Sequence, residues 1–98
     1  MKQTIKERVF KEALKFNHPL TRQDIIMLHF KFWCDDHQYY INNHMPDDHK
    51  NNLTSPKIAR LYLGDLTCSL TNDHIKGTYL RGPHSFKKIS RNQYVPNI

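Results

Sequence analysis

The segment that most constrains the fold runs from Leu53 to Leu66 and reads LTSPKIARLYLGDL. Ser55 suits the N-cap of a helix, and Pro56 suits the first helical position, where its missing N–H is not needed. Apolar residues then recur at helical spacing, at Ile58, Tyr62 and Leu66 with Ala59 and Leu63 beside them. The pattern predicts a helix with one apolar stripe.

Lys57 and Arg60 lie off this stripe, in the first two turns of the predicted helix. We therefore expect the stripe to pack against the first helix of the chain, while the basic side chains lie on another face. A short helix with a basic first half is what reading the major groove of DNA requires.

Two further helices are predicted upstream. Residues 3–16 follow helical spacing, with charged residues on the polar side, and the residue before Pro19 is pushed out of the helical region. The next helix has the clearest local signal in the chain, because Thr21 and Asp24 are spaced as a capping box. Leu20 and Ile25 occupy the positions of a hydrophobic staple.

This second helix runs from Arg22 to about Phe30. Leu28, Phe30 and Phe32 alternate with polar residues, as in a strand, yet Ile25, Leu28 and Phe32 also fit helical spacing. We favour a continuing helix.

Residues 34–52 have a different composition, with four Asp, three His, four Asn and one Pro. We interpret the segment as a polar insert or loop between the second and third helices, although Asp36–Asn42 is compatible with a short helix. Loops of this length are uncommon inside compact domains.

The C-terminal third predicts a β-hairpin. Thr67–Asp73 is a polar connector, and Ile75–Leu80 and Ser85–Ile89 are short β-prone runs. Arg81–His84, Arg-Gly-Pro-His, reads as the turn between them. Residues 92–98 are expected to form a frayed or packed tail.

The charge balance favours an anionic partner. Lys and Arg number 15 against nine acidic residues, for a formal charge of +6. From His74 to the C-terminus there are five Lys or Arg and no Asp or Glu. An excess of this kind favours nucleic acid first and a membrane surface second.

Other compositional features bear on class and compartment. The 98 residues suffice for one small domain with one core. No apolar run approaches the roughly 18 residues of a membrane span, and the charged N-terminus does not resemble a signal peptide. Two cysteines, Cys34 and Cys68, make no disulfide framework, so we expect a cytoplasmic protein with reduced thiols and no membrane partner.

The order of helix, capped helix, helix and basic hairpin resembles the winged helix-turn-helix family. IKERVFKEAL–HPLTRQDI is similar to the first two helices of that family, LTSPKIARLYLGDL to its recognition helix, and IKGTYLRGPHSFKKI to its wing. The sequence departs from the family at residues 34–52, where a short turn is usual. The resemblance implies a single α+β domain over residues 1–98 that binds double-stranded DNA, as a small transcription regulator of phage or mobile-element type.

The resemblance also implies roles for individual residues. The third helix would enter the major groove, with Arg60 as the candidate for a bidentate contact to guanine. The hairpin would lie along the backbone or reach the minor groove. The implied DNA-binding residues are Ser55, Lys57, Arg60, Arg81, Lys87 and Lys88. Winged helices often dimerise, and the sequence does not decide between a monomer and a homodimer.

A metal centre is the next alternative. The residues Cys34, His37, His44 and His49 are zinc-type ligands at spacings that a small loop could close. They match no standard pattern, and solvated histidines explain them equally well. We therefore expect no metal and no cofactor.

Two further classes of function remain as alternatives. NNHMPDDHKNNL is loosely similar to the His- and Asn-rich site of HNH nucleases, but the glycines and paired cysteines that frame such sites are missing. A small phage-type protein could instead dock on a host protein as an inhibitor or adaptor. We expect a DNA-binding protein rather than an enzyme.

Overall fold

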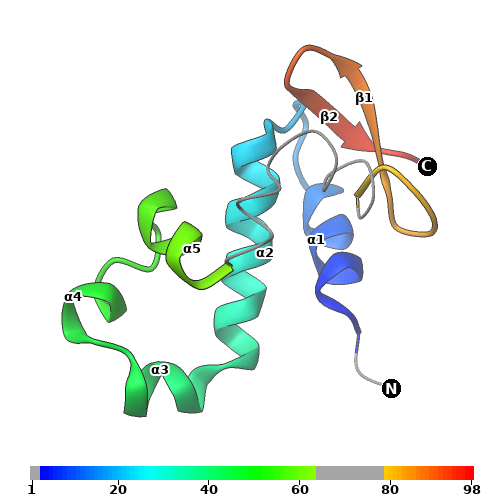
Figure 1. The fold of residues 1–98 in the computed structure, drawn as a ribbon. Coiled ribbons are helices and arrows are strands. Elements are labelled where there is room, and N and C mark those ends of the chain that lie inside the picture. The colour runs from blue at the N-terminus through cyan, green and yellow to red at the C-terminus, as the bar shows by residue number, and fades with distance from the viewer. Residues whose placement is uncertain (1–2, 64–78) are drawn as a thin grey trace.

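The computed structural model describes residues 3–63 and 79–98, which form an α+β fold with a two-stranded antiparallel sheet. The elements are α1 (Ile5–Ala13), α2 (Arg22–Asp36), α3 (Gln38–His44), α4 (Asp47–Lys50), α5 (Pro56–Leu63), β1 (Phe86–Ser90) and β2 (Gln93–Pro96). Figure 1 shows α2 as the central element, with α1 on one side, α3, α4 and α5 on the other, and the hairpin beside the start of α2.

The start of α2 confirms the predicted capping box. The Thr21 side chain accepts a hydrogen bond from the Asp24 N–H at 3.1 Å, and the Asp24 carboxylate accepts one from the Thr21 N–H at 3.0 Å. Leu20 and Ile25, the predicted staple, are both buried in one cluster. The helix continues to Asp36, as the helical interpretation of its second half predicted.

The first helix is shorter than the predicted range of residues 3–16. It begins after Thr4, whose side chain accepts a hydrogen bond from the Glu7 N–H at 3.1 Å, and it ends at Ala13. Leu14 and Phe16, within the predicted range, lie beyond the end of the helix and are exposed.

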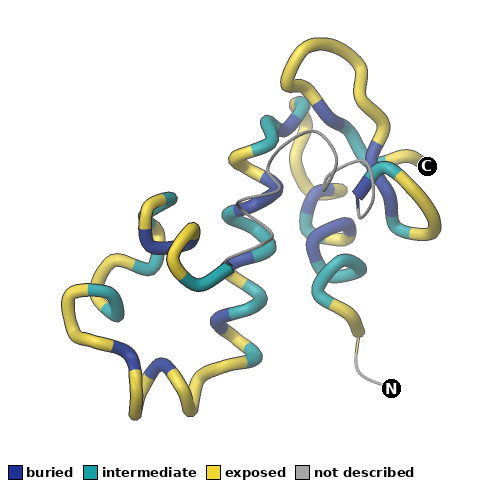
Figure 2. The backbone as a smooth tube through the Cα atoms, in the orientation of Figure 1, coloured by how far each residue is buried: buried dark blue, intermediate teal, exposed yellow. Residues whose placement is uncertain are grey.

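Two clusters of buried side chains share α2 (Figure 2). The hairpin-side core joins α1, the N-terminal half of α2 and the sheet, through Val9, Ala13, Leu20, Ile25, Tyr79, Phe86 and Tyr94. The helical core joins the C-terminal half of α2 to α3 and α5, through Phe30, Cys34, Ile41, Met45, Ile58 and Ala59. Because one helix serves both cores, its two halves face different neighbours.

The position of α5 corrects one prediction. The helix begins at Pro56, and the Ala59 N–H donates to the Ser55 carbonyl at 3.0 Å, as expected of an N-cap. Ile58 belongs to the helical core and Tyr62 packs against it, so this stripe faces α2 rather than α1. Leu66, the last residue of the predicted stripe, lies outside the described residues.

The interpretation of residues 34–52 as a loop was wrong, whereas the alternative of a short helix near Asp36–Asn42 corresponds to α3. The segment contains the end of α2 and both short helices, α3 and α4. Ile41 and Met45 are among its few apolar side chains, and both are buried in the helical core. Burial of these two side chains against α2 organises a stretch whose composition is otherwise typical of a solvated loop.

The predicted hairpin paired the wrong segments. The run that begins at Ser85 becomes β1, but its antiparallel partner is β2, in the predicted tail, with Lys88 opposite Tyr94. Of the run 75–80, residues 75–78 lie outside the described residues, while Tyr79 is buried in the hairpin-side core and is not a strand residue. Asn92 turns the chain with a φ of 56°, a left-handed conformation that asparagine tolerates well.

Candidate nucleic-acid interface

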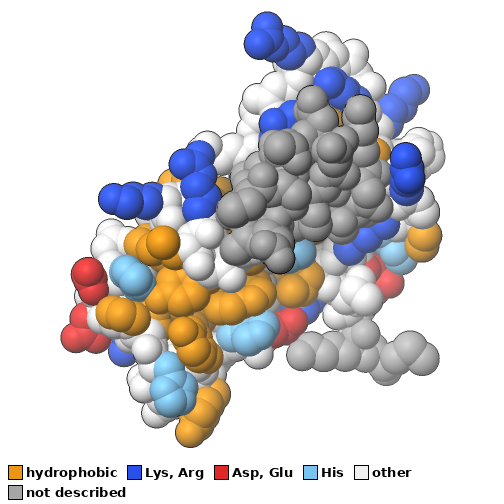
Figure 3. Space-filling model, viewed as in Figure 1, with side chains coloured by type: hydrophobic (Ala, Val, Ile, Leu, Met, Phe, Trp, Pro, Cys, Tyr) orange, Lys and Arg blue, Asp and Glu red, His pale blue; other side chains and the backbone are white. Residues whose placement is uncertain are grey.

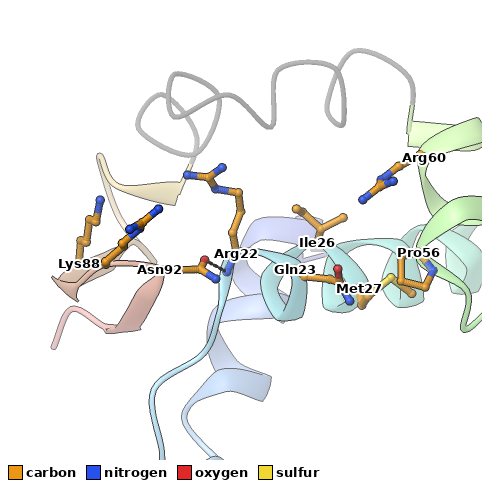
Figure 4. A pocket seen from close by; sticks show the side chains of 9 residues that line it. Arg22, Gln23, Ile26, Met27, Pro56, Arg60, Lys88 and Asn92 are labelled. Carbon is orange, nitrogen blue, oxygen red and sulfur yellow. Dashed lines mark hydrogen bonds between the residues drawn. The ribbon is translucent and has the colours of Figure 1, made fainter.

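A groove of about 650 Å³ lies between the start of α2, α5 and the hairpin. Four basic side chains from these three elements line it, Arg22, Arg60, Lys88 and Arg91. Figure 4 shows Arg60 extending from α5 toward α2, and Lys88 on the opposite side of the groove. Ile26 and Met27 form part of its floor, together with Pro56 at the start of α5.

Hydrogen bonds attach the hairpin wall of the groove to the start of α2. The Asn92 side-chain oxygen accepts a hydrogen bond from the Arg22 N–H at 2.9 Å. Leu20 and Tyr94 exchange two backbone hydrogen bonds, each of 2.8 Å. These bonds place the turn residues Arg91 and Asn92 beside the first turn of α2.

The α5 wall is fixed by burial on its opposite face. Ile58 and Ala59 are buried against α2, while Lys57 and Arg60 are exposed, as the helical periodicity predicted. The Tyr62 hydroxyl and His49 Nδ1 share a hydrogen bond of 2.6 Å, which joins α5 to α4. Burial is the main cause that raises the pKa of Tyr62, so this hydroxyl stays protonated at neutral pH.

The described lining of the groove is positive and contains no carboxylate. Asp24 is close in sequence, but its carboxylate accepts the Thr21 N–H and its side chain lines a different cavity. Cationic walls of one sign raise the local concentration of polyanions and favour phosphate contacts. The groove therefore has the charge and the multi-element construction of a nucleic-acid interface.

The structure brings only some of the predicted DNA-binding residues together. Arg60 and Lys88 line the groove, and Ser55 and Lys57 lie at the start of α5 without lining it. Lys87 precedes Lys88 in β1, so its side chain lies on the opposite face of the strand. Arg81 is exposed in the loop before β1, where its carbonyl accepts a hydrogen bond from the Lys6 ammonium at 2.7 Å.

Arg22, Arg91 and Asn92 are among the lining residues that were missed from the sequence. The interpretation of residues 92–98 as a tail hid the hairpin turn that contains Arg91 and Asn92. Asn92 lies between a β-prone run and the Tyr94-Val95 pair, so it could have been read as a turn signal. Arg22 is conspicuous only once the hairpin is seen beside the first turn of α2.

The zinc candidates are dispersed among aromatic partners. Cys34 is buried in α2, and burial raises the pKa of its thiol to about 11. His37 stacks on Trp33 with 4.2 Å between ring centroids, and His49 contacts Tyr62. His44 contacts Tyr40 instead. Across the described ranges, no three His, Cys, Asp or Glu side chains are gathered as a metal site would require.

A second surface has the opposite character. Tyr39, Tyr40 and Leu61 have exposed side chains, and the Tyr40 ring contacts Trp33 and Tyr62, which pack against the helical core. Figure 3 shows hydrophobic and His side chains gathered over this end of the molecule, while Lys and Arg lie over the hairpin and α5. We call this set of five residues the aromatic surface.

Comparisons with protein-family models, curated proteins and solved structures found no match to this chain. In the parts of the chain that the structure describes, no helix is both long enough and apolar enough to cross a membrane.

Proposed function

We propose that this protein binds double-stranded DNA as a small winged-helix transcription regulator. The observation that carries the proposal is the groove in which Arg22, Arg60, Lys88 and Arg91 converge from α2, α5 and the hairpin. Charge alone is compatible with many anionic partners. Convergence of basic side chains around a short exposed helix favours a duplex, because the major groove admits an α-helix while flanking elements meet the phosphates.

In this arrangement the exposed side of α5 enters the major groove. Arg60 then reads a base edge, since arginine binds the two acceptors of guanine bidentately. Lys88 and Arg91 contact the backbone from the hairpin, and Arg22 does so from the first turn of α2, the position from which the first helix of a helix-turn-helix pair meets the phosphates.

The test is fluorescence anisotropy at several salt concentrations, with random duplexes and with a duplex selected by the unmodified protein from a random pool. Lys88→Ala should weaken binding to both duplexes and reduce the salt slope by about one unit, because one phosphate contact is lost. Arg60→Ala should cost about 1–3 kcal/mol on the selected duplex and much less on random DNA.

Lys87 provides the matched control, because it has the same side chain one residue away on the opposite face of β1. Lys87→Ala should change neither affinity nor salt slope by as much as Lys88→Ala does. Equal effects of the two substitutions would mean that the groove is not the interface. Absence of DNA binding by the unmodified protein even at low salt would overturn the proposed function.

The aromatic surface favours a second candidate, docking on another protein. Tyrosine and tryptophan are enriched at protein interfaces, and Tyr39 is 75% exposed without an evident structural need. A Tyr39→Ala, Leu61→Ala variant that keeps full DNA affinity but loses biological activity would favour this function. Loss of activity through Lys88→Ala alone would favour DNA binding.

A further inference from the structure

A second cavity, of about 540 Å³, runs along another face of α2. Asp24, Leu28, Lys31 and Asp35 line it from α2 at steps of three and four residues, so they form one stripe of the helix. The cavity is separate from the basic groove, and the proposed function makes no use of it. Its volume falls in the range of small-molecule sites, about 300–1,000 Å³.

The walls facing this stripe come from two connecting segments. Phe16 and Leu20 line the cavity from the connection between α1 and α2, and Leu53 and Thr54 line it from the connection before α5. Phe16 is 42% exposed, and Leu28 and Leu53 are only partly buried. Apolar side chains therefore line a concave site that is open to solvent. Binding of an apolar molecule there would remove apolar surface from water, which is favourable.

The polar groups around the cavity determine which molecules fit. Its carboxylates, Asp24 and Asp35, accept hydrogen bonds and repel anions. Lys31 lines the cavity as well, but its ammonium lies 5.6 Å from the centroid of the Phe32 ring. The Cys34 thiol in the lining stays neutral at physiological pH. A ligand with a donor group is thus accepted, whereas a carboxylate is disfavoured.

The cavity and the basic groove share structure. The Met27 side chain, on α2, lines both the cavity and the groove. Figure 4 shows it among the residues that line the groove. Leu53 and Thr54, from the segment before α5, line the cavity, and Pro56, the first residue of α5, lines the groove. A molecule seated against Met27 and Leu53 therefore contacts the segment that sets the position of α5.

We propose that this cavity binds a small apolar organic molecule with a hydrogen-bond donor or cationic head group, and that its occupancy changes the affinity of the groove for DNA. The second half of this inference rests on the proposed function, and the first half does not.

Isothermal titration calorimetry tests the binding half with three probes that share one ring system: indole, tryptamine and indole-3-acetate. Indole and tryptamine should bind, and indole-3-acetate should bind at least about tenfold more weakly, a difference of about 1.4 kcal/mol. Asp35→Asn should reduce the preference for tryptamine over indole-3-acetate. Asp48→Asn, an exposed carboxylate on α4 away from the cavity lining, is the matched control and should leave it unchanged.

Two variants fill the cavity from exposed positions, Thr54→Trp and Lys31→Trp. Either one, shown by its thermal melt to be folded, should abolish binding of indole and tryptamine. Equal affinity for all three probes, binding that survives the filling substitutions, or no binding of indole and tryptamine at about millimolar concentration would overturn the cavity as a site.

Anisotropy with the selected duplex tests the coupling. Saturating tryptamine should change the Kd for DNA at least about threefold in the unmodified protein and not in the Thr54→Trp variant, which controls for tryptamine binding to DNA itself. An unchanged Kd would overturn the coupling. Absence of DNA binding would overturn the proposed function, while calorimetry would still decide whether the cavity binds its ligand.

Discussion

The two cores of this protein are built in different ways. The hairpin-side core joins residues from both ends of the chain, with Val9 and Tyr94 in the same cluster. Among the described residues, the buried members of the helical core all lie between Phe30 and Ala59 in the sequence. The first core depends on long-range contacts such as the Leu20–Tyr94 bridge, and the second on neighbouring helices along the sequence. Closing a longer loop costs more conformational entropy, so forming the hairpin-side core costs more conformational entropy than forming the helical core.

Their surfaces differ as well. The hairpin carries Lys87, Lys88 and Arg91, whereas α4 and the end of α2 carry Asp35, Asp36, Asp47 and Asp48. The basic groove begins where the hairpin meets α2, and the aromatic surface lies over the helical core. Under the proposed function, the basic end contacts nucleic acid, and the end that carries the aromatic surface is available for a protein.

The largest expected effect tests whether the two cores unfold together. Phe30→Ala empties a fully buried site in the helical core and should destabilise the protein by about 3–5 kcal/mol. Because α2 belongs to both cores, we expect one cooperative transition, with Trp33 fluorescence and far-UV circular dichroism coinciding. Separate transitions would show that the hairpin-side core folds without the helical core.

Leu61→Ala is the control for Phe30→Ala. Because Leu61 is exposed, this substitution should change stability by less than about 0.5 kcal/mol.

Ile58→Ala tests the attachment of α5 to α2. Ile58 is buried in the helical core, so the substitution should cost about 2–4 kcal/mol. Thermal and urea denaturation measure the loss. An unchanged stability would contradict the packing of α5 on α2, and with it the geometry of the groove.

Alkaline pH should affect the two cores in sequence. Burial raises the pKa of Cys34, in the helical core, from about 9 to about 11. Below the unfolded value the thiol is neutral in both states; as pH rises from about 9 to 11 only the unfolded state loses its proton, so stability falls. Burial also raises the pKa of Tyr79, in the hairpin-side core, so its contribution to stability declines only above about pH 10.

Urea denaturation at successive pH values measures both contributions. Cys34→Ala should lower stability at neutral pH but remove the decline between about pH 9 and 10. If the decline in that interval persists unchanged in this variant, the Cys34 thiol is not its source.

The smallest expected effect concerns the capping box that begins α2. Thr21→Ala removes the acceptor for the Asp24 N–H and should cost about 0.5–2 kcal/mol. Thr21→Ser retains the hydroxyl and should keep most of the stability. Equal losses in the two variants, measured by thermal denaturation, would show that the methyl group rather than the cap is important.

Several features could be predicted from the sequence because they depend on neighbouring residues. The capping box at Thr21 and the start of α5 at Pro56 are local signals, and the structure has both. The β-prone run 85–89 is a local signal too, and it predicted β1 and with it the α+β class. Arg60 could be placed on the exposed side of α5 by helical periodicity alone.

Tertiary structure decided which elements meet. β1 pairs with residues 93–96 because Tyr94 bonds to Leu20 and is buried beside Phe86, contacts that no local pattern reveals. Residues 34–52 include α3 and α4, and Ile41 and Met45 from this stretch are buried with α2 residues in the helical core. Arg22 and Arg91 are 69 positions apart in the sequence, and they line one groove because the hairpin lies against the start of α2. Local propensities are weak compared with burial, and burial depends on partners that only the folded chain brings together.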